Sequence, residues 1–222
     1  MRRLIAVTPE TFRSEYGIDV RVLHEVEEID PKNRRVLVKS LESKKGWWEP
    51  YDRLLIATGA VPFCPKVPGS DAAGIYGLHS LQSGITVREV VDSERPKRAV
   101  VVGGGYIGLE MAEALLLRGL EVSLVERGEQ VMGTLDPDMG ALVSDAVIEV
   151  GVRLYRGESL EAFEIGDGRV TAVVTDRRTL PADLVILGLG VRPRTELADR
   201  AGVALGVRGA IRVNGRMQTS VP

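Results

Sequence analysis

Three glycines near the middle of the chain have the spacing of a nucleotide-binding turn. Gly103, Gly105 and Gly108 form the pattern G-x-G-x-x-G between an apolar run and a stretch of helix-forming residues. In this pattern the first glycine permits a tight turn, the second lets the backbone approach a pyrophosphate, and the third lets the helix pack closely on the strand. The amino end of the helix adds free N–H groups and a partial positive charge. The sequence therefore predicts a dinucleotide site, and we expect Gly104 and Ile107 to belong to the same cofactor-binding loop.

Glu126 follows at the position where such domains hold the adenosine ribose. It closes the apolar stretch 120–126 and lies 18 residues after Gly108. A carboxylate at this point can accept both ribose hydroxyls and would repel a 2′-phosphate, which favours NAD(H) over NADP(H). Arg127 softens that preference, because an arginine there could bind the 2′-phosphate. The opposing interpretation is a glycine-rich turn in an unrelated α/β sheet, and the register of strand, helix, second strand and acid argues against it.

The segments around the glycines predict the α/β class of fold. Residues 98–102 are a continuous apolar run, typical of a parallel strand that is buried on both faces. We expect strand, helix, strand, helix, strand, an antiparallel hairpin and a buried strand at 98–102, 106–118, 120–126, 136–150, 152–155, 160–175 and 184–190. This order predicts a doubly wound, Rossmann-like domain with an antiparallel β excursion. In the second helix we expect the apolar residues at spacings of three and four to face the core: Met139, Leu142, Val143, Ala146, Val147 and Val150.

The part of the chain before these segments has a different pattern. Residues 8–16 predict a short helix, and alternating apolar residues predict strands over 19–30 and 34–40. A short apolar run over 51–60 predicts a buried strand that ends in a tight loop. The polar stretch 93–98 marks the first domain boundary.

The composition of the chain limits the classes of function that it could have. The chain has 222 residues, 44% of them hydrophobic and 27% charged, with a net charge of −2. This balance is that of an ordinary globular protein, so we expect no nucleic-acid partner. The opening stretch 1–12 is too soon interrupted by polar residues for a signal peptide or membrane span. One cysteine and two distant histidines predict neither a disulfide nor a metal site, and they favour a cytoplasmic protein.

Four stretches together resemble the flavin- and pyridine-nucleotide-dependent disulfide reductases. They are "LLIATGAVPFCPKVPG", "VVVGGGYIGLEMAEAL", "LVERGEQVMGTLDPDM" and "LGVRPRTELA". The nearest branch contains coenzyme A-disulfide reductases, persulfide reductases and NADH oxidases, and the resemblance covers essentially the whole chain. In that family an NAD domain is inserted into an FAD domain. The resemblance therefore implies a first, partial FAD-binding segment at 1–92, an NAD(P)-binding domain at 93–206, and the start of the returning FAD segment at 207–222.

The resemblance implies a set of residues against FAD. Thr58, Gly59 and Ala60 match the turn that lies against this cofactor, and Val26 matches a strand whose backbone approaches the adenine. For Thr58 and Gly59 the structural interpretation is a turn that ends a strand.

A second set is implied against the nicotinamide. Tyr106 matches the aromatic residue that shields the flavin and moves aside for nicotinamide, and Glu110 matches an acid near both rings. Gly190 matches a glycine that closes over the NAD site. The alternative for Tyr106 and Glu110 is a pair of exposed helix residues without a role.

The chain also departs from the family. No second glycine cluster precedes Thr58, and the aspartate-bearing motif for the FAD ribityl chain and the dimerisation domain are not found. Nothing corresponds to the family's catalytic cysteine. Cys64 lies in a proline-rich loop without an evident activating neighbour or resolving partner, so we expect no catalytic residue here. We therefore expect a chain truncated at both ends, in which FAD is doubtful.

Three functions remain open on this reasoning. The first is a flavin-dependent oxidoreductase that passes hydride from NADH to FAD and electrons on to a thiol, disulfide, persulfide or oxygen. The second is a non-catalytic NAD(H)-binding fragment or subunit, which could self-associate through an uncovered sheet edge. The third is the ferredoxin- or rubredoxin-reductase branch, whose partner would be a small electron carrier.

Overall fold

The computed structural model describes residues 6–222, and residues 1–5 of the opening stretch lie outside it. The chain forms two compact units. One takes the chain up to Gly59 and again from Pro193 to Pro222, and the other takes Ala60–Arg192. These limits differ from the expected boundaries after residues 92 and 206, and the division into FAD and NAD parts stays a prediction.

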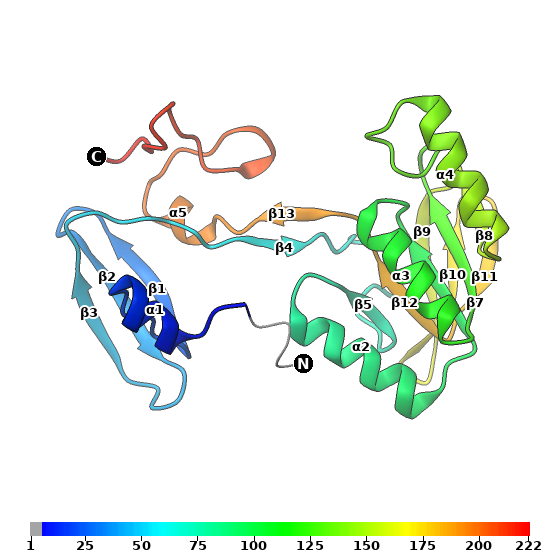
Figure 1. Ribbon diagram of the computed structural model, residues 1–222, viewed down its shortest axis with the longest axis horizontal. Helices are drawn as coiled ribbons and strands as arrows, with labels where there is room; N and C mark the ends of the chain where they lie inside the picture. The colour runs from blue at the N-terminus through cyan, green and yellow to red at the C-terminus, as the bar shows by residue number, and fades with distance from the viewer. Residues whose placement is uncertain (1–5) are drawn as a thin grey trace. The chain divides into compact units, whose positions relative to one another are not determined.

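A five-stranded parallel sheet is the centre of the second unit (Figure 1). Its order is β5 (Ile75–Gly77), β12 (Leu184–Leu187), β6 (Arg98–Val102), β7 (Glu121–Glu126) and β8 (Arg153–Arg156), and every neighbouring pair is parallel. The four strands that the sequence predicts here are confirmed. The fifth, β5, was missed because three residues are too few to show a period.

Three helices cover one face of this sheet. They are α2 (Leu81–Glu94), α3 (Tyr106–Leu117) and α4 (Pro137–Glu149). Apolar side chains from α2, α3 and alternate strand positions form one core, with Val101, Leu124 and Ile186 fully buried. The α2 helix was missed by the sequence reasoning, although its residues Val87 and Val91 lie in this core.

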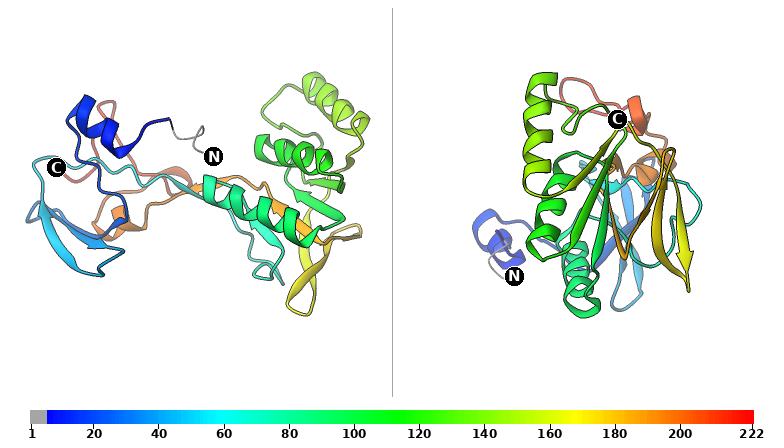
Figure 2. Two further views of the ribbon diagram at one scale, coloured as in Figure 1. Left: turned by 60° about the horizontal axis from the view of Figure 1, so that its bottom comes forward. Right: turned by 90° about the vertical axis from the view of Figure 1, so that its right-hand side faces the viewer.

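A small antiparallel sheet covers the other face, where a helix layer is usual in doubly wound folds (Figure 2). It consists of β9 (Leu160–Gly166), β10 (Arg169–Thr175) and β11 (Thr179–Pro181). Asp167 and Gly168 both have positive φ, which suits a two-residue hairpin turn. The second core lies between the two sheets and includes Val100, Val185 and Val173. The predicted antiparallel excursion is thus confirmed.

The first unit contains an antiparallel three-stranded sheet. Its strands are β1 (His24–Asp30), β2 (Arg35–Ser40) and β3 (Gly46–Pro50), in that order. The predicted short helix is α1 (Pro9–Tyr16), which begins after Thr8 and ends before Gly17. Two short helical segments lie after residue 193: they are α5 (Glu196–Arg200) and a 3-10 turn at Val207–Gly209. The α5 helix packs beside the small core of the sheet through Leu197.

Two short strands stand where the chain passes from one unit to the other. They are β4 (Ala60–Pro62) and β13 (Val191–Pro193), and they form a two-stranded sheet. The backbone N–H of Phe63 donates to the carbonyl oxygen of Gly190 at 2.9 Å. The N–H of Arg194 donates to the carbonyl oxygen of Gly59 at 3.0 Å.

The predicted buried strand over 51–60 is wrong for residues 51–59. These residues are irregular, Leu55 is 84% exposed, and only Ala60 belongs to a strand. A strand that is buried on both faces needs hydrogen-bonding neighbours and covering layers. Among the described residues of the first unit, no strand pairs with residues 51–59. The segment is apolar, but it has no sheet in which it could form a strand.

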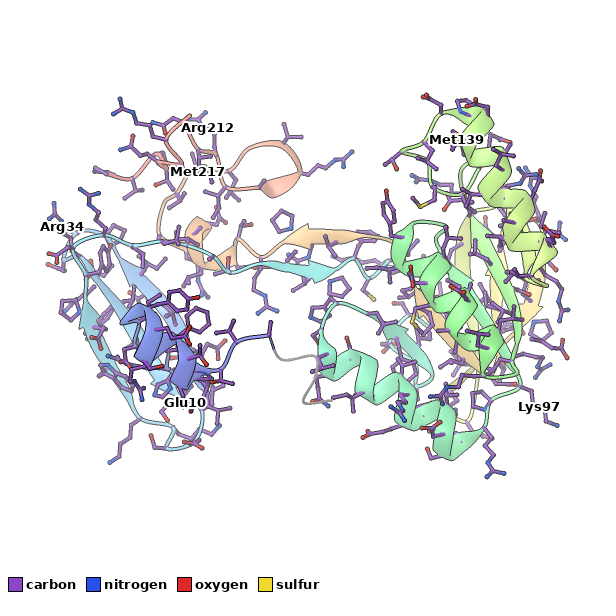
Figure 3. All side chains as sticks on the ribbon, viewed as in Figure 1. Glu10, Arg34, Lys97, Met139, Arg212 and Met217 are labelled. Atoms are coloured by element: carbon purple, nitrogen blue, oxygen red, sulfur yellow. The ribbon has the colours of Figure 1, made fainter. Side chains whose placement is uncertain are left out.

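The predicted buried face of α4 is partly wrong. Val143 and Val147 pack against the core as expected, but the other four residues of the predicted stripe are exposed: Met139, Leu142, Ala146 and Val150. Figure 3 shows Met139 near the first turn of the helix. Gly140 and Ser144 make the buried contact instead, and the Ser144 hydroxyl donates to the Gly140 carbonyl at 2.8 Å. The helix contacts the edge strand β8, so it needs only a narrow apolar stripe.

Candidate functional site

The glycine turn forms where β6 ends and α3 begins. Gly103 has φ +106°, and its N–H donates to the carbonyl oxygen of Val125 at 2.8 Å, which ties the turn to β7. A Cβ built on Gly103 would lie 2.4 Å from the carbonyl oxygen of Gly188, the residue after β12. A Cβ on Gly108 would lie 1.9 Å from the carbonyl oxygen of Gly103. No residue but glycine fits these two positions without backbone movement.

The glycine turn is open on the side where α3 begins. Gly105 is the residue before the helix, it has no side chain to cap the helix end, and a Cβ built there would meet nothing within 4 Å. The first N–H groups of a helix have no partner within it, and they carry the positive end of the helix dipole. A pyrophosphate needs both an approachable backbone and free donors, and the turn supplies them.

Glu126 joins the end of β7 to the glycine turn through its carboxylate. One oxygen, Oε2, accepts the N–H of Gly104 at 2.6 Å, and the other, Oε1, accepts the N–H of Gly128 at 2.7 Å. An ionised carboxylate can accept about four hydrogen bonds, so each oxygen keeps room for one more donor. The geometry lets Glu126 accept two ribose hydroxyls while it holds the turn in place.

The segment after β7 also supports the turn, and the sequence reasoning missed it. The N–H of Met132 donates to the carbonyl oxygen of Gly104 at 2.8 Å, and the fully buried Val131 packs against Gly104. The side-chain amide of Gln130 donates to the carbonyl oxygen of Leu135 at 2.9 Å and closes the loop. The one available signal was the apolar pair at 131–132 inside a polar stretch, while contacts through backbone atoms leave no sequence pattern.

The residues expected against nicotinamide lie in the same unit as the glycine turn. Tyr106 is 69% exposed at the first position of α3, and Glu110 is exposed one turn later. Gly190 follows β12, has φ +84°, and is also exposed. Because β12 and β6 are parallel neighbours, Gly190 and the glycine turn lie beyond the same carboxyl edge of the sheet. Ligands of open α/β sheets bind outside this edge.

The residues expected against FAD lie in or beside the first unit. The Thr58 hydroxyl donates to the carbonyl oxygen of Arg194 at 2.5 Å, and Gly59 has φ +71°. Ala60 begins β4, and Val26 lies on β1 next to an irregularity in its pairing with β2. Thr58 and Gly59 thus form a turn that is held by the returning chain, which is the structural interpretation of the motif.

The described residues of the first unit do not fit an FAD pyrophosphate. The one longer helix there, α1, begins after Thr8, whose hydroxyl accepts the N–H of Thr11 at 3.3 Å and so occupies the helix end. Within residues 6–59 and 193–222, no glycine turn joins a strand to a helix. A flavin nucleotide would therefore need a phosphate site from residues other than these.

Cys64 is a free, exposed thiol in the loop after β4. It follows Phe63 and precedes Pro65 in an irregular segment. A redox thiol needs cationic neighbours or a helix dipole to stabilise its thiolate, and a resolving partner. Cys64 has no resolving partner in the chain, because the sequence contains no second cysteine.

Asp183 fixes the opposite, amino end of the sheet. Its carboxylate accepts the Arg98 guanidinium at 2.7 Å and the N–H groups of Arg98 and Lys97 at 2.9 and 3.0 Å (Figure 3 labels Lys97). These donors favour the charged form, the Arg98 side chain most of all, so the pKa of Asp183 lies below its ordinary value. This contact ties β12 to β6 far from the glycine turn and is structural.

A membrane-crossing helix is not found among residues 6–222, since no helix there is both long and apolar enough.

Comparison with known proteins gives consistent matches over the whole chain. The sequence model of the family described as "Pyridine nucleotide-disulphide oxidoreductase" matches residues 4–222. An NADH oxidase of Methanocaldococcus jannaschii is 38% identical over 221 residues, which are 99% of this chain and 48% of that protein. An NAD(P)H sulfur oxidoreductase (CoA-dependent) of Pyrococcus abyssi is 38% identical over 99% of this chain and 48% of its own length.

Among solved structures, reduced Bacillus anthracis CoADR-RHD superposes with a TM-score of 0.94 at 35% identity. The match covers 100% of this chain and 40% of that one. The chain thus spans about half the length of the curated relatives that it matches.

Proposed function

Because the chain belongs to the pyridine nucleotide-disulphide oxidoreductase family, we propose that it binds NAD(H) for a flavin-dependent oxidoreductase. Members of this family use NAD(P)H and FAD. The observation that carries the proposal is the contact between Glu126 and the N–H of Gly104, which joins the ribose-binding acid to the pyrophosphate-binding turn. This contact supports the proposal, because it would keep the two parts of one dinucleotide site in a fixed relation.

The chain's residues have binding and orienting roles in this proposal. The amino end of α3 and the turn at Gly103–Gly105 hold the pyrophosphate, and Glu126 accepts the adenosine ribose hydroxyls. With the adenosine end fixed in this way, the nicotinamide end lies toward Tyr106, Glu110 and Gly190. FAD, where the complete site is present, supplies the acceptor for hydride.

A specific observation favours a second candidate, a non-catalytic NAD(H)-binding module. The first unit offers no glycine-lined helix end for FAD among its described residues. On that reading this chain binds the dinucleotide and performs no electron transfer unaided. The choice of a thiol, disulfide, persulfide or oxygen as final acceptor, and a cytoplasmic location, remain predictions.

The visible absorption spectrum of the purified chain, recorded before and after NADH is added, separates the two candidates. A flavin band that NADH bleaches supports the reductase. A colourless protein whose thermal midpoint rises with NADH supports the binding module, since a ligand of the folded state stabilises it by RT ln(1 + [L]/Kd).

Gly105→Asp is the matched control for this experiment. Aspartate is favoured before a helix and its Cβ has free space, so the fold should be kept. Its charge should repel the pyrophosphate and remove the NADH-dependent rise in thermal midpoint. A wild-type protein without any response to NADH would contradict the proposal in both forms.

A further inference from the structure

Arg156 lies beside Glu126 at the carboxyl edge of the sheet. The two residues are register partners in the parallel pair β7–β8. Two positions earlier, Leu124 and Leu154 both contact the helix-face core. Side chains two apart on a strand share a face, so Arg156 and Glu126 also lie on one face. The guanidinium of Arg156 is therefore one strand away from the carboxylate that we assign to the adenosine ribose.

The charge of Arg156 is not used by the fold. Its neighbours are paired: the Arg178 guanidinium bonds Glu158 at 2.9 Å and stacks 4.6 Å from the centre of the Tyr155 ring. At the other end of β8, Arg153 pairs with Glu121. Within residues 6–222, no ion pair is found for Arg156, which is exposed.

An open pocket of about 440 Å³ lies next to this cation. Its charged lining residues are Glu129, Arg156, Glu158, Arg177 and Arg178. Glu158 is almost fully buried and neutralised by Arg178, so Arg156 and Arg177 face only one further acid. The balance of charge in the pocket therefore suits an anion close to Arg156.

We propose that Arg156 determines selectivity by binding the 2′-phosphate of NADP(H), with Arg127 as a second cation. Neighbouring strands lie about 4.8 Å apart, a span that an arginine side chain crosses easily. A guanidinium binds phosphate through two parallel, charge-assisted hydrogen bonds. Glu126 repels the same phosphate, so the two residues oppose each other and the chain binds both NADH and NADPH. This inference rests on the proposed function, because the ribose position depends on Glu126.

Isothermal titration of the full chain with two adenosine fragments tests the proposal. Adenosine 5′-monophosphate lacks the 2′-phosphate, and adenosine 2′,5′-bisphosphate carries it. We expect Arg156→Ala to weaken binding of the bisphosphate by about tenfold, and of the monophosphate by less than about twofold. Arg156→Lys should recover part of the loss, because it keeps the charge without the bidentate geometry.

Arg153→Ala is the matched control, since it removes an exposed arginine from the same strand at the end remote from the ribose. It should leave the ratio of the two affinities unchanged. Equal losses for both fragments in Arg156→Ala would show an adenine contact or a structural role and would overturn the proposal. An unchanged ratio in that variant would overturn it too.

The same titrations distinguish this inference from the proposed function. If the wild-type chain binds neither fragment and does not respond to NADH, the dinucleotide site itself is refuted, and the inference fails with it. If the chain binds NADH and the monophosphate but Arg156→Ala keeps the wild-type ratio, only the role of Arg156 is refuted.

Discussion

The carbonyl oxygen of Gly103 lies 1.9 Å from the point where a Cβ on Gly108 would stand. The third glycine of the turn thus packs against the first. That contact brings the first turn of α3 onto the end of β6, and it leaves the helix end open for a ligand. The three glycines have different roles in packing and in binding. Substitutions at single positions can therefore change stability and ligand binding separately.

Gly108→Ala should destabilise the second unit, because the methyl group meets backbone atoms that cannot move independently. Overpacking of this kind costs at least about 1–3 kcal/mol. Gly105→Ala should keep the wild-type free energy of unfolding, since its Cβ meets nothing, but should weaken NADH binding. Urea unfolding and NADH titration of both variants measure the two effects, and equal stability of both variants would contradict the role given to Gly108.

Glu126→Ala should weaken NADH binding by roughly 10–100-fold, because hydrogen bonds to a charged group are worth about 1.5–3 kcal/mol. It should also lower stability, since the N–H groups of Gly104 and Gly128 lose their acceptor. Glu126→Gln keeps one acceptor oxygen and removes the charge, so the ratio of NADPH to NADH affinity should rise. Fluorescence titration with both dinucleotides provides the check, and an unchanged ratio would count against the charge repulsion.

Asp183→Asn should make the free energy of unfolding depend less on pH in the acid range. The folded-state pKa of Asp183 is lowered, chiefly by Arg98, so its contribution is complete above the unfolded value of about 3.9 and is lost as the pH falls through the folded value. At pH 7 the variant should be less stable by about 1–3 kcal/mol, and the difference should shrink below about pH 4.

Urea unfolding at a series of pH values gives this comparison directly. Asp167→Asn is the control, because it changes an aspartate in a hairpin turn where asparagine is equally suited. A constant difference between wild type and Asp183→Asn from pH 7 to pH 3 would show that the ionised carboxylate is not what stabilises the contact.

Cys64→Ser should leave both the thermal midpoint and NADH binding unchanged, because the thiol is exposed and serine is close to cysteine in size. The wild-type thiol should react at the rate of an ordinary exposed cysteine with a chromogenic aromatic disulfide. A rate many times higher at neutral pH would indicate a stabilised thiolate and would reopen a redox role.

The sequence predicted the parts of the site that depend on residue type at fixed spacing. Gly103 and Gly108 are recognisable because backbone proximity demands glycine. Glu126 is recognisable because an acid at this position is typical of the ribose site that we propose. The contacts of Met132 and Gly188 were not predictable, since they use backbone atoms that every residue has. Residues 51–59 were misjudged for a different reason: an apolar run becomes a strand only where other strands can pair with it.

The α4 helix shows a similar limit of periodicity. Its apolar residues follow helical spacing, yet the buried contact is made by Gly140 and Ser144. A helix that packs on an edge strand covers only a small part of the sheet. Which strand lies at the edge depends on the strand order. The strand order β5-β12-β6-β7-β8 depends on long-range pairing that no local pattern records.

The pairing of β4 with β13 has a consequence for how this kind of protein can be assembled and rearranged. The chain leaves the first unit after Gly59 and re-enters it at Pro193, and the N–H of Arg194 bonds the carbonyl of Gly59 directly. Removal of the 133 residues Ala60–Arg192 would thus leave two neighbouring ends that a short linker can join. The second unit is in this sense a cassette, which a gene can gain, lose or exchange while the path of the host chain stays the same.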